Sequence, residues 1–166
     1  REDFGLLPIE NAQWGPLVFL HFGKPDLSLA EYLQPLKDRL NLGGLRFIQR
    51  VTYEIACNWK VYVDNYLDGG YHVNCLHPGL SDQLDLNSYK TEIFDQLSIQ
   101  SCSDNRDASS TEGVDFSARV TGGADYVWIY PNLMLNRYGP ILDTNLVLPL
   151  GPDKTVTVFD YYFEEP

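Results

Sequence analysis

The chain has 166 residues, 44% of them hydrophobic and 13% aromatic, which suits one globular domain with an apolar core and excludes a disordered chain. Its formal net charge of −11 argues against nucleic acid or an anionic membrane as partner and agrees with a cationic substrate or with a basic patch on a partner. No apolar run reaches the length of a membrane span.

The cysteines Cys57, Cys75 and Cys102 are sparse and include no C-x2-C pair, so they favour free thiols in a reducing compartment over a disulfide scaffold. No signal or transit segment is visible, and the pattern begins abruptly at Arg1, so we expect a chain that is truncated at its start. The expected location is the cytoplasm, or the chloroplast stroma if the source is a plant or an alga.

The first residues predict two short strands and a linker. Apolar runs at Phe4–Ile9 and Leu17–Phe22 lie on either side of a turn predicted at Asn11–Pro16. Gly23–Asp26 has the composition of a linker.

An amphipathic helix is predicted from Ser28 to Asn41. Ser28 and Glu31 form a capping box, and Gly43-Gly44 closes the helix. Leucines recur at helical spacing and indicate core packing, at Leu29, Leu33, Leu36 and Leu40.

A half-buried strand is predicted from Leu45 to Ala56. Val51, Tyr53 and Ile55 alternate there with polar residues, which is the period of a strand with one buried face. This strand leads directly into the stretch that carries most of the chemistry.

The stretch Asn58–Leu80 contains His72 and His77. An iron(II) ion that activates oxygen is usually held by two imidazoles and one carboxylate. Histidines five positions apart point about 140° apart on an ideal helix, so both reach one ion only if the helix ends or bends between them. Gly69-Gly70 loosens the turn before the first histidine, and Pro78-Gly79 stops a helix after the second. The spacing alone leaves open a metal site or two ordinary polar residues at a helix end.

Strands dominate the second half of the chain. A loop is predicted at Gly79–Asn87, strands at Tyr89–Phe94 and Leu97–Ser101, and an exposed loop at Ser103–Gly113. Four further strands are joined by short turns and are therefore expected to pair antiparallel, at Tyr126–Tyr130, Leu133–Tyr138, Ile141–Leu150 and Thr155–Phe163. An antiparallel sheet with a long helix against one face is an α+β architecture.

The stretch around the histidines resembles the iron-binding segment of the large (alpha) subunits of Rieske-type non-haem iron oxygenases. The residues that match it in order are Asn58-Trp59-Lys60, Asp64-Asn65-Tyr66, Asp68, Tyr71-His72 and His77-Pro78. Within that family the chain is most similar to the choline monooxygenases and related quaternary-ammonium oxygenases, through DNYLDGGYHV, Ser98–Cys102 and Ile129–Pro152.

The resemblance implies a helix-grip fold (Bet v 1/START-like) and a division into two parts. Residues 1–26 would be the C-terminal remnant of a Rieske domain with its linker, and residues 27–166 a mononuclear iron catalytic domain truncated at its C-terminus. A [2Fe–2S] centre of this type needs two cysteines and two histidines, and no cysteine precedes Cys57. The cluster is therefore expected in a missing N-terminal domain.

The resemblance also assigns the site. His72 and His77 would bind iron(II), and the third ligand, a carboxylate, is expected beyond Pro166 and not at Asp143, Asp160 or Glu164. Asp68 and Asn65 would be catalytic residues, with Asp68 linking the first histidine to the cluster of a neighbouring subunit. In the family the acid lies three residues before that histidine, whereas Asp68 lies four before it. A π-type bulge in the helix could absorb the extra residue.

The implied activity is hydroxylation of a small quaternary ammonium compound, choline to betaine aldehyde hydrate, with O2 at the iron. The implied partners are a ferredoxin or reductase as electron donor and further copies of the chain in a homotrimer or other homo-oligomer. Two alternatives stay open: an aromatic-ring-hydroxylating dioxygenase and a non-redox helix-grip ligand-binding module. Aromatic faces hold such cations with about 0.5–2 kcal/mol per contact; candidate walls are Tyr126, Trp128, Tyr130 and Tyr138.

Overall fold

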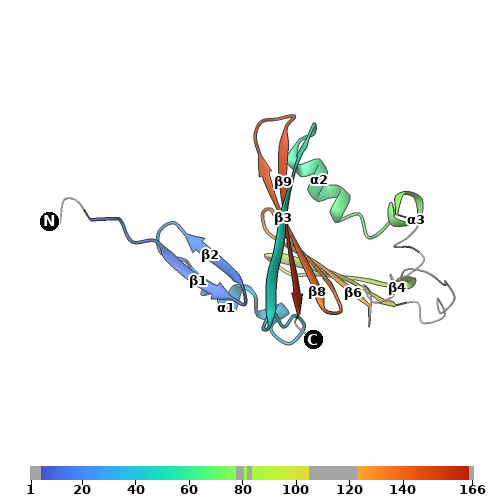
Figure 1. Cartoon of the computed structure of the whole chain (residues 1–166), viewed down its shortest axis with the longest axis horizontal. Coiled ribbons are helices and arrows are strands. Elements are labelled where there is room, and N and C mark those ends of the chain that lie inside the picture. The colour runs from blue at the N-terminus through green and yellow to red at the C-terminus, as the bar shows by residue number, and fades with distance from the viewer. Residues whose placement is uncertain (1–4, 78–80, 82–83, 105–122, 165–166) are drawn as a thin grey trace. The chain divides into compact units, whose positions relative to one another are not determined.

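The computed structural model describes residues 5–77, 81, 84–104 and 123–164 (Figure 1). It divides into two compact units, Arg1–Arg46 and Phe47–Pro166. The domain boundary predicted after residue 26 stays a prediction. No described helix is long and apolar enough to cross a membrane.

The first unit begins with a β-hairpin, β1 (Glu10–Trp14) paired antiparallel with β2 (Leu17–His21). The sequence prediction placed the first strand and the turn too early: the described part of Phe4–Ile9 is not strand, and the turn is only Gly15-Pro16. Gly15 adopts a φ of +57°, which permits this short turn and lets β1 occupy the residues predicted as turn.

A short helix and a 3₁₀ turn replace the predicted helix Ser28–Asn41. They are α1 (Leu29–Tyr32) and η2 (Gln34–Leu36). The capping box is confirmed, since the Ser28 backbone N–H donates to Glu31 Oε2 at 2.9 Å. The helix stops early because Pro35 has no N–H to continue the α-helical bonding. The predicted core role of the leucines is confirmed where they are buried, at Leu33, Leu36 and Leu40.

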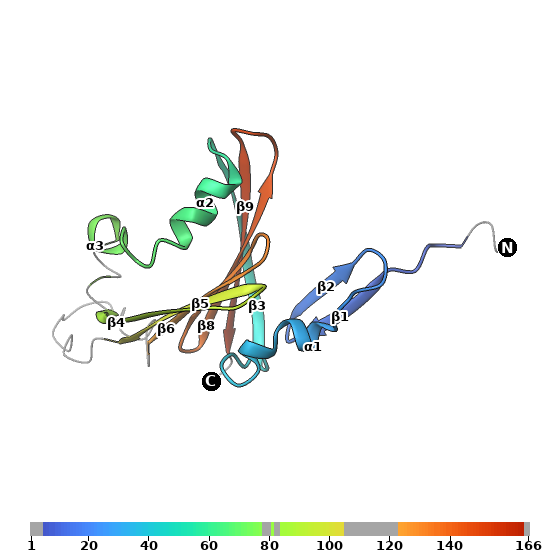
Figure 2. The same cartoon turned by 180° about the vertical axis from the view of Figure 1, so that it is seen from behind.

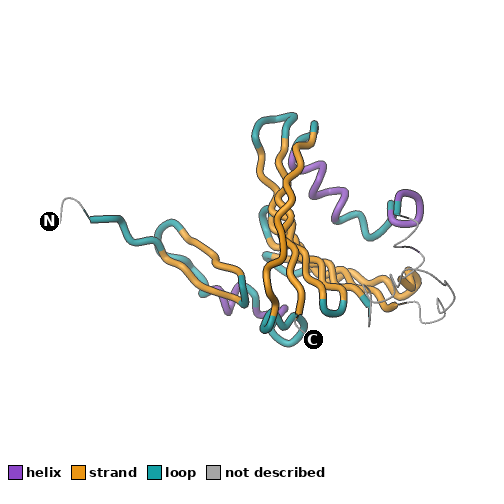
Figure 3. Tube along the Cα trace, in the orientation of Figure 1, coloured by secondary structure: helices purple, strands orange, loops and turns teal. Residues whose placement is uncertain are grey.

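The second unit is built on a seven-stranded sheet with the order β3-β9-β8-β7-β6-β5-β4. Figure 3 shows that strands make up most of the described chain and helices only a small part. Consecutive strands from β4 to β9 pair antiparallel. Their bounds are β3 (Leu45–Ile55), β4 (Leu84–Ile93), β5 (Leu97–Asp104), β6 (Ala124–Ile129), β7 (Leu133–Tyr138), β8 (Ile141–Pro149) and β9 (Thr155–Glu164). Because β3 and β4 lie at opposite edges, the chain between them crosses the width of the sheet.

This crossover carries α2 (Trp59–Tyr66) and α3 (Val73–Leu76), which lie on one side of the sheet (Figures 1 and 2). Val63 of α2 packs on Met134 and Val147. The predicted α+β class, an antiparallel sheet with helix against one face, is confirmed. The expected long helix consists of two short helices, because the chain turns between them.

The predictions for β4, β3 and β5 each differ in detail from the structure. β4 begins at Leu84, inside the predicted loop, because a β-bulge between Asp85 and Lys90 accommodates the polar residues that suggested a loop. Ser88 Oγ accepts a bond from the Ser103 backbone N–H at 2.8 Å across this bulge. In β3, Tyr53 is exposed, so the predicted regular burial does not hold. β5 extends to Asp104, and the rest of the predicted loop Ser103–Gly113 lies outside the described residues.

The N-terminus of α2 is tied to the turn between β8 and β9. Asn58 caps the helix by accepting from the Lys60 N–H at 3.0 Å, and its Nδ2 donates to the Pro152 carbonyl at 2.8 Å. Thr155 Oγ1 donates to the Cys57 carbonyl at 2.8 Å. These bonds fix where the crossover leaves β3.

We predict that Asn58→Ala destabilises the second unit by about 1–2 kcal/mol, because both the cap and the Pro152 bond are lost. Asn58→Asp keeps a cap acceptor and loses only the donor to Pro152, so its loss should be smaller. Urea unfolding followed by tryptophan fluorescence measures both. Equal stability of Asn58→Ala and wild type would refute this anchoring role.

Candidate metal centre

A tight left-handed turn separates α2 from the histidines. Gly69 and Gly70 have φ values of +73° and +78°, which glycine adopts at little cost. A Cβ on Gly70 would also lie 3.0 Å from Cε2 of Tyr89, so a side chain there would require the Tyr89 ring to shift by a few tenths of an ångström. The turn ends one helix and starts another with a new direction.

His72 and His77 lie at the two ends of α3. The helix ends at His77, whose φ of −125° and ψ of 63° are not helical, which confirms the predicted helix end. The two ring centroids lie 5.2 Å apart with the ring planes at 77°. A metal–imidazole bond of about 2.1 Å puts an ion roughly 3 Å from each centroid, so two rings at this separation can share one ion.

Asp68 holds the first of these rings. Its Oδ2 lies 2.6 Å from His72 Nδ1, and its Oδ1 accepts from the Gly70 backbone N–H at 3.0 Å. An acceptor on Nδ1 fixes the proton there and leaves Nε2 free for a metal. The Asp68 and His72 side chains are 25% and 18% exposed, so the pair is partly shielded from water.

The expected π-bulge is absent between Asp68 and His72. The left-handed turn at Gly69-Gly70 absorbs the four-residue spacing instead, and the Asp68 carboxylate still reaches the ring. Asn65, the other predicted catalytic residue, is exposed in the last turn of α2, and its role stays a prediction.

The described residues contain no cluster of three or more His, Cys, Asp or Glu side chains that could hold a metal ion. The three carboxylates that the sequence analysis excluded as third iron ligand lie in other environments. Asp160 forms a bidentate pair with Arg50 at 2.6 and 2.7 Å, Glu164 pairs with Arg137, and Asp143 is buried in the sheet. The two imidazoles fit a 2-His-1-carboxylate centre that takes its third ligand from elsewhere.

The four predicted aromatic walls do not form one group. Tyr126 stands 5.6 Å from Tyr138 and 6.5 Å from Tyr66 of α2, with all ring pairs edge to face. Trp128 packs against the apolar cluster around Val63 of α2, whereas Tyr130 is 58% exposed. The helix side of the sheet therefore presents Tyr126, Tyr138 and Trp128, and their contact with a substrate stays a prediction.

A buried polar cluster beneath α2 escaped the sequence analysis. Its side chains come from β5, β7 and β8, and each is at least nine-tenths buried: Gln100, Asn136, Asp143 and Asn145. Burial, with Asp143 as the next cause, raises the pKa of Tyr62 to about 12 and that of Tyr66 well above its ordinary value, so both stay neutral donors. The signal in the sequence was a polar residue at an inward position of an otherwise apolar strand.

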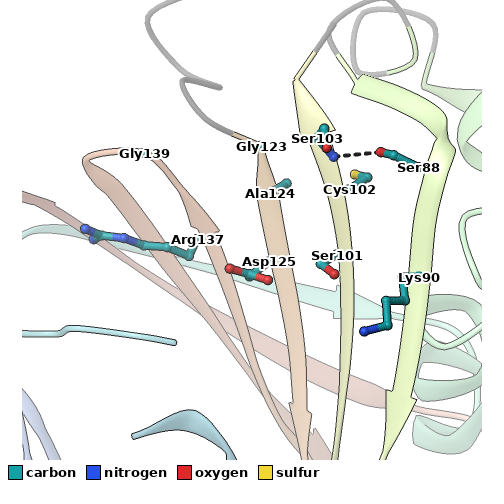
Figure 4. Close-up of a pocket in the computed structure, with 10 residues that line it drawn as sticks. All are labelled: Ser88, Lys90, Ser101, Cys102, Ser103, Gly123, Ala124, Asp125, Arg137 and Gly139. Atoms are coloured by element: carbon teal, nitrogen blue, oxygen red, sulfur yellow. Dashed lines mark hydrogen bonds between the residues drawn. The ribbon is translucent and has the colours of Figure 1, made fainter. Parts of the chain in front are cut away.

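A pocket of about 330 Å³ opens on the opposite face of the sheet (Figure 4). Cross-strand partners Lys90, Ser101, Asp125 and Arg137 form one row of its lining. Side chains alternate between the two faces of a sheet along each strand, so this row faces away from Gln100. Gln100 lies on the helix side, where its Nε2 donates to the Tyr66 carbonyl of α2. The pocket is thus separate from the histidine site.

The sequence matches a family of known proteins. The family model described as "Ring hydroxylating alpha subunit (catalytic domain)" matches residues 42–166. The choline monooxygenase of Arabidopsis thaliana, named as chloroplastic, is 46% identical over 176 residues, covering 98% of this chain and 41% of that protein. The protein of the same name from Amaranthus tricolor is 35% identical over 172 residues, covering 98% and 38%. The chain spans about two fifths of the length of these relatives.

Solved structures share the fold. A quaternary ammonium Rieske monooxygenase in complex with an inhibitor has a TM-score of 0.77 at 22% identity, over 96% of this chain and 43% of that one. Naphthalene 1,2-dioxygenase from Rhodococcus sp. bound to indole has a TM-score of 0.73 at 20% identity, over 99% and 47%. At these identities the similarity concerns the fold and does not distinguish between their substrates.

Proposed function

Because the chain belongs to the ring-hydroxylating alpha-subunit family of Rieske-type iron oxygenases, we propose that it is the catalytic part of an oxygenase that hydroxylates a small quaternary ammonium compound, with choline as first candidate. The observation that carries the proposal is the Asp68–His72 bond of 2.6 Å beside a second imidazole, in a chain 46% identical to a choline monooxygenase.

His72 Nε2 and a ring nitrogen of His77 would hold iron(II), with a carboxylate from beyond Pro166 as third ligand. When bound there, the iron supplies the oxygen chemistry of the family. Asp68 keeps the His72 proton on Nδ1 and orients the ring, and both functions are available in the geometry.

The remaining parts of the proposed enzyme lie outside the described site. We propose that residues 1–26 are the end of a Rieske domain whose [2Fe–2S] cluster delivers electrons from a ferredoxin or reductase. Transfer between subunits of a homotrimer or other homo-oligomer would use Asp68. The relatives named as chloroplastic support the chloroplast stroma as the compartment.

Choline is favoured over an aromatic substrate by the identity to choline monooxygenases, with the tyrosines on the helix side of the sheet as physical support. The likeness to naphthalene dioxygenase rests on fold alone, so an aromatic substrate is the second candidate. Membership of an oxygenase family favours a redox enzyme over a binding module without redox chemistry.

We predict that His72→Ala and His77→Ala each abolish iron at the mononuclear site of the full-length protein, because each removes one of two imidazole ligands. Iron content after correction for the cluster measures this. His21→Ala is the matched control, since His21 lies in the first unit and its Nδ1 is 3.2 Å from the Gly23 carbonyl oxygen. Wild-type mononuclear iron in both site variants would rule out the assignment.

We expect the full-length enzyme to oxidise choline in preference to benzoate, with glycine betaine and carnitine as further trimethylammonium candidates. Oxygen uptake coupled to product formation measures the preference. The neutral isostere 3,3-dimethylbutan-1-ol should be a poorer substrate than choline, because it lacks the charge that aromatic faces attract. Turnover of benzoate alone would establish the aromatic alternative.

Asp68→Asn should retain both metal centres and cluster reduction while product formation falls by about 10- to 100-fold, because the amide keeps the shape and loses the charge beside His72. Single turnover of pre-reduced full-length enzyme measures this step. Asp64→Asn, an exposed acid one turn earlier on α2, is the control. Normal single-turnover product from Asp68→Asn would leave Asp68 without a role in electron transfer.

A further inference from the structure

Four hydrogen bonds join Asp143 to two successive turns of α2. Asn136 Nδ2 and Asn145 Nδ2 donate to Asp143 Oδ1 at 2.6 and 3.1 Å. Tyr66 Oη donates to Asn136 Oδ1 at 2.8 Å, and Tyr62 Oη donates to Asn145 Oδ1 at 3.4 Å. One buried carboxylate is therefore the common acceptor of two branches that start on the inner face of the helix.

Asp143 Oδ1 accepts both asparagine bonds and so sets the orientation of each amide. An ionised carboxylate only accepts, so each asparagine must turn its NH2 group toward Asp143 and its carbonyl toward the helix. The carbonyl of Asn136 is then presented to the hydroxyl of Tyr66 as an acceptor. Charge-assisted bonds are shorter and stronger than neutral ones, and the 2.6 Å bond from Asn136 fits that description.

The same end of α2 has a second connection to the sheet. Gln100 Nε2 donates to the Tyr66 carbonyl at 2.9 Å, and Tyr89 Oη donates to Gln100 Oε1 at 2.7 Å. The Tyr89 ring lies against Gly70, where an added Cβ would be 3.0 Å from it. The side chain and the backbone of Tyr66 are thus both held, and so is the turn that follows.

Tyr66 is the last residue of α2 and lies two positions before Asp68. We propose that Asp143 is a positioning residue for the Asp68–His72 pair and acts on it through Asn136 and Tyr66. The expected effect on Fe(II) binding rests on the proposed function, whereas the expected effect on hydrogen exchange in the metal-free protein does not. Asp143 does not touch the histidines; it fixes the helix end from which the Gly69-Gly70 turn departs.

The test uses metal-free and iron-loaded full-length protein with Asp143→Asn and Tyr66→Phe. Each variant nearly keeps the size of its side chain. Asp143→Asn weakens the Asn136 branch, and Tyr66→Phe removes it together with the contacts of Tyr66 Oη with the Val127 and Leu135 carbonyls. We expect faster amide hydrogen exchange of residues 67–76 without metal, and about tenfold weaker Fe(II) affinity. The EPR signal of the nitric oxide complex of the Fe(II) enzyme should change its line shape, which loss of stability alone would not cause.

Asp160→Asn is the matched control. Asp160 lies on the neighbouring strand β9, forms an ion pair with Arg50, and faces the opposite side of the sheet from Asp143. It should leave exchange, affinity and line shape within about twofold of wild type. The double variant should resemble the stronger single variant, since both act on one path. If Asp143→Asn does not fold, Tyr66→Phe carries the test.

Wild-type exchange and Fe(II) affinity in both Asp143→Asn and Tyr66→Phe would overturn the positioning role. Additive effects in the double variant would overturn the path through Tyr66. Failure of the proposed function is a different result: wild-type protein would then bind no Fe(II) at His72 and His77. The exchange measurement on metal-free protein still decides the positioning role in that case.

Discussion

The left-handed turn at Gly69 and Gly70 is the constraint on which the arrangement of Asp68, His72 and His77 depends. A continuous helix would point the two imidazoles about 140° apart. The turn ends α2, brings Asp68 back onto His72 Nδ1 at 2.6 Å, and starts α3 so that the two rings lie 5.2 Å apart. Side chains at these two positions would add strain of about 1–2 kcal/mol per residue, and Gly70 has Tyr89 against it. The geometry of the candidate site therefore depends on backbone conformation as well as on side-chain identity.

The sheet gives this turn a fixed starting point. α2 crosses between the two edge strands and is held at both ends, by Asn58 and Pro152 at its start and by Tyr66 and Gln100 at its end. An apolar contact surface would allow the helix to slide, whereas directional bonds between buried polar groups are satisfied in one position only. Burying Asp143 is costly without partners, and the amides of Asn136 and Asn145 offset that cost.

Structural features that depend only on neighbouring residues along the chain could be predicted from the sequence. β7 was predicted with its observed bounds, because LMLNRY lies between a Pro-Asn and a Gly-Pro turn. The capping box at Ser28 is equally local, and so is the helix end at His77. The helix predicted through Pro35 is wrong, because the helical spacing of the leucines does not compensate for the missing N–H of proline. The bulge near Ser88 requires a partner strand to be seen.

The candidate site was predictable in part for the same reason. The histidine pair and Asp68 lie within a few residues of one another, so motif and spacing identify them, although the spacing rule could not show that a glycine turn brings Asp68 to the ring. The Asp143 cluster could not be found in this way, since Tyr66 and Asn136 are 70 residues apart and meet only after the sheet forms. Long-range polar contacts leave little trace in a single sequence.

Anomalous X-ray diffraction at the iron edge, on crystals of the full-length Fe(II) protein, tests the central claim most directly. We predict one iron peak, apart from the cluster, within bonding distance of His72 Nε2 and of a ring nitrogen of His77, with Asp68 still on His72 Nδ1. A mononuclear iron peak bonded to other residues, or none beside these two imidazoles in an active enzyme, would contradict it.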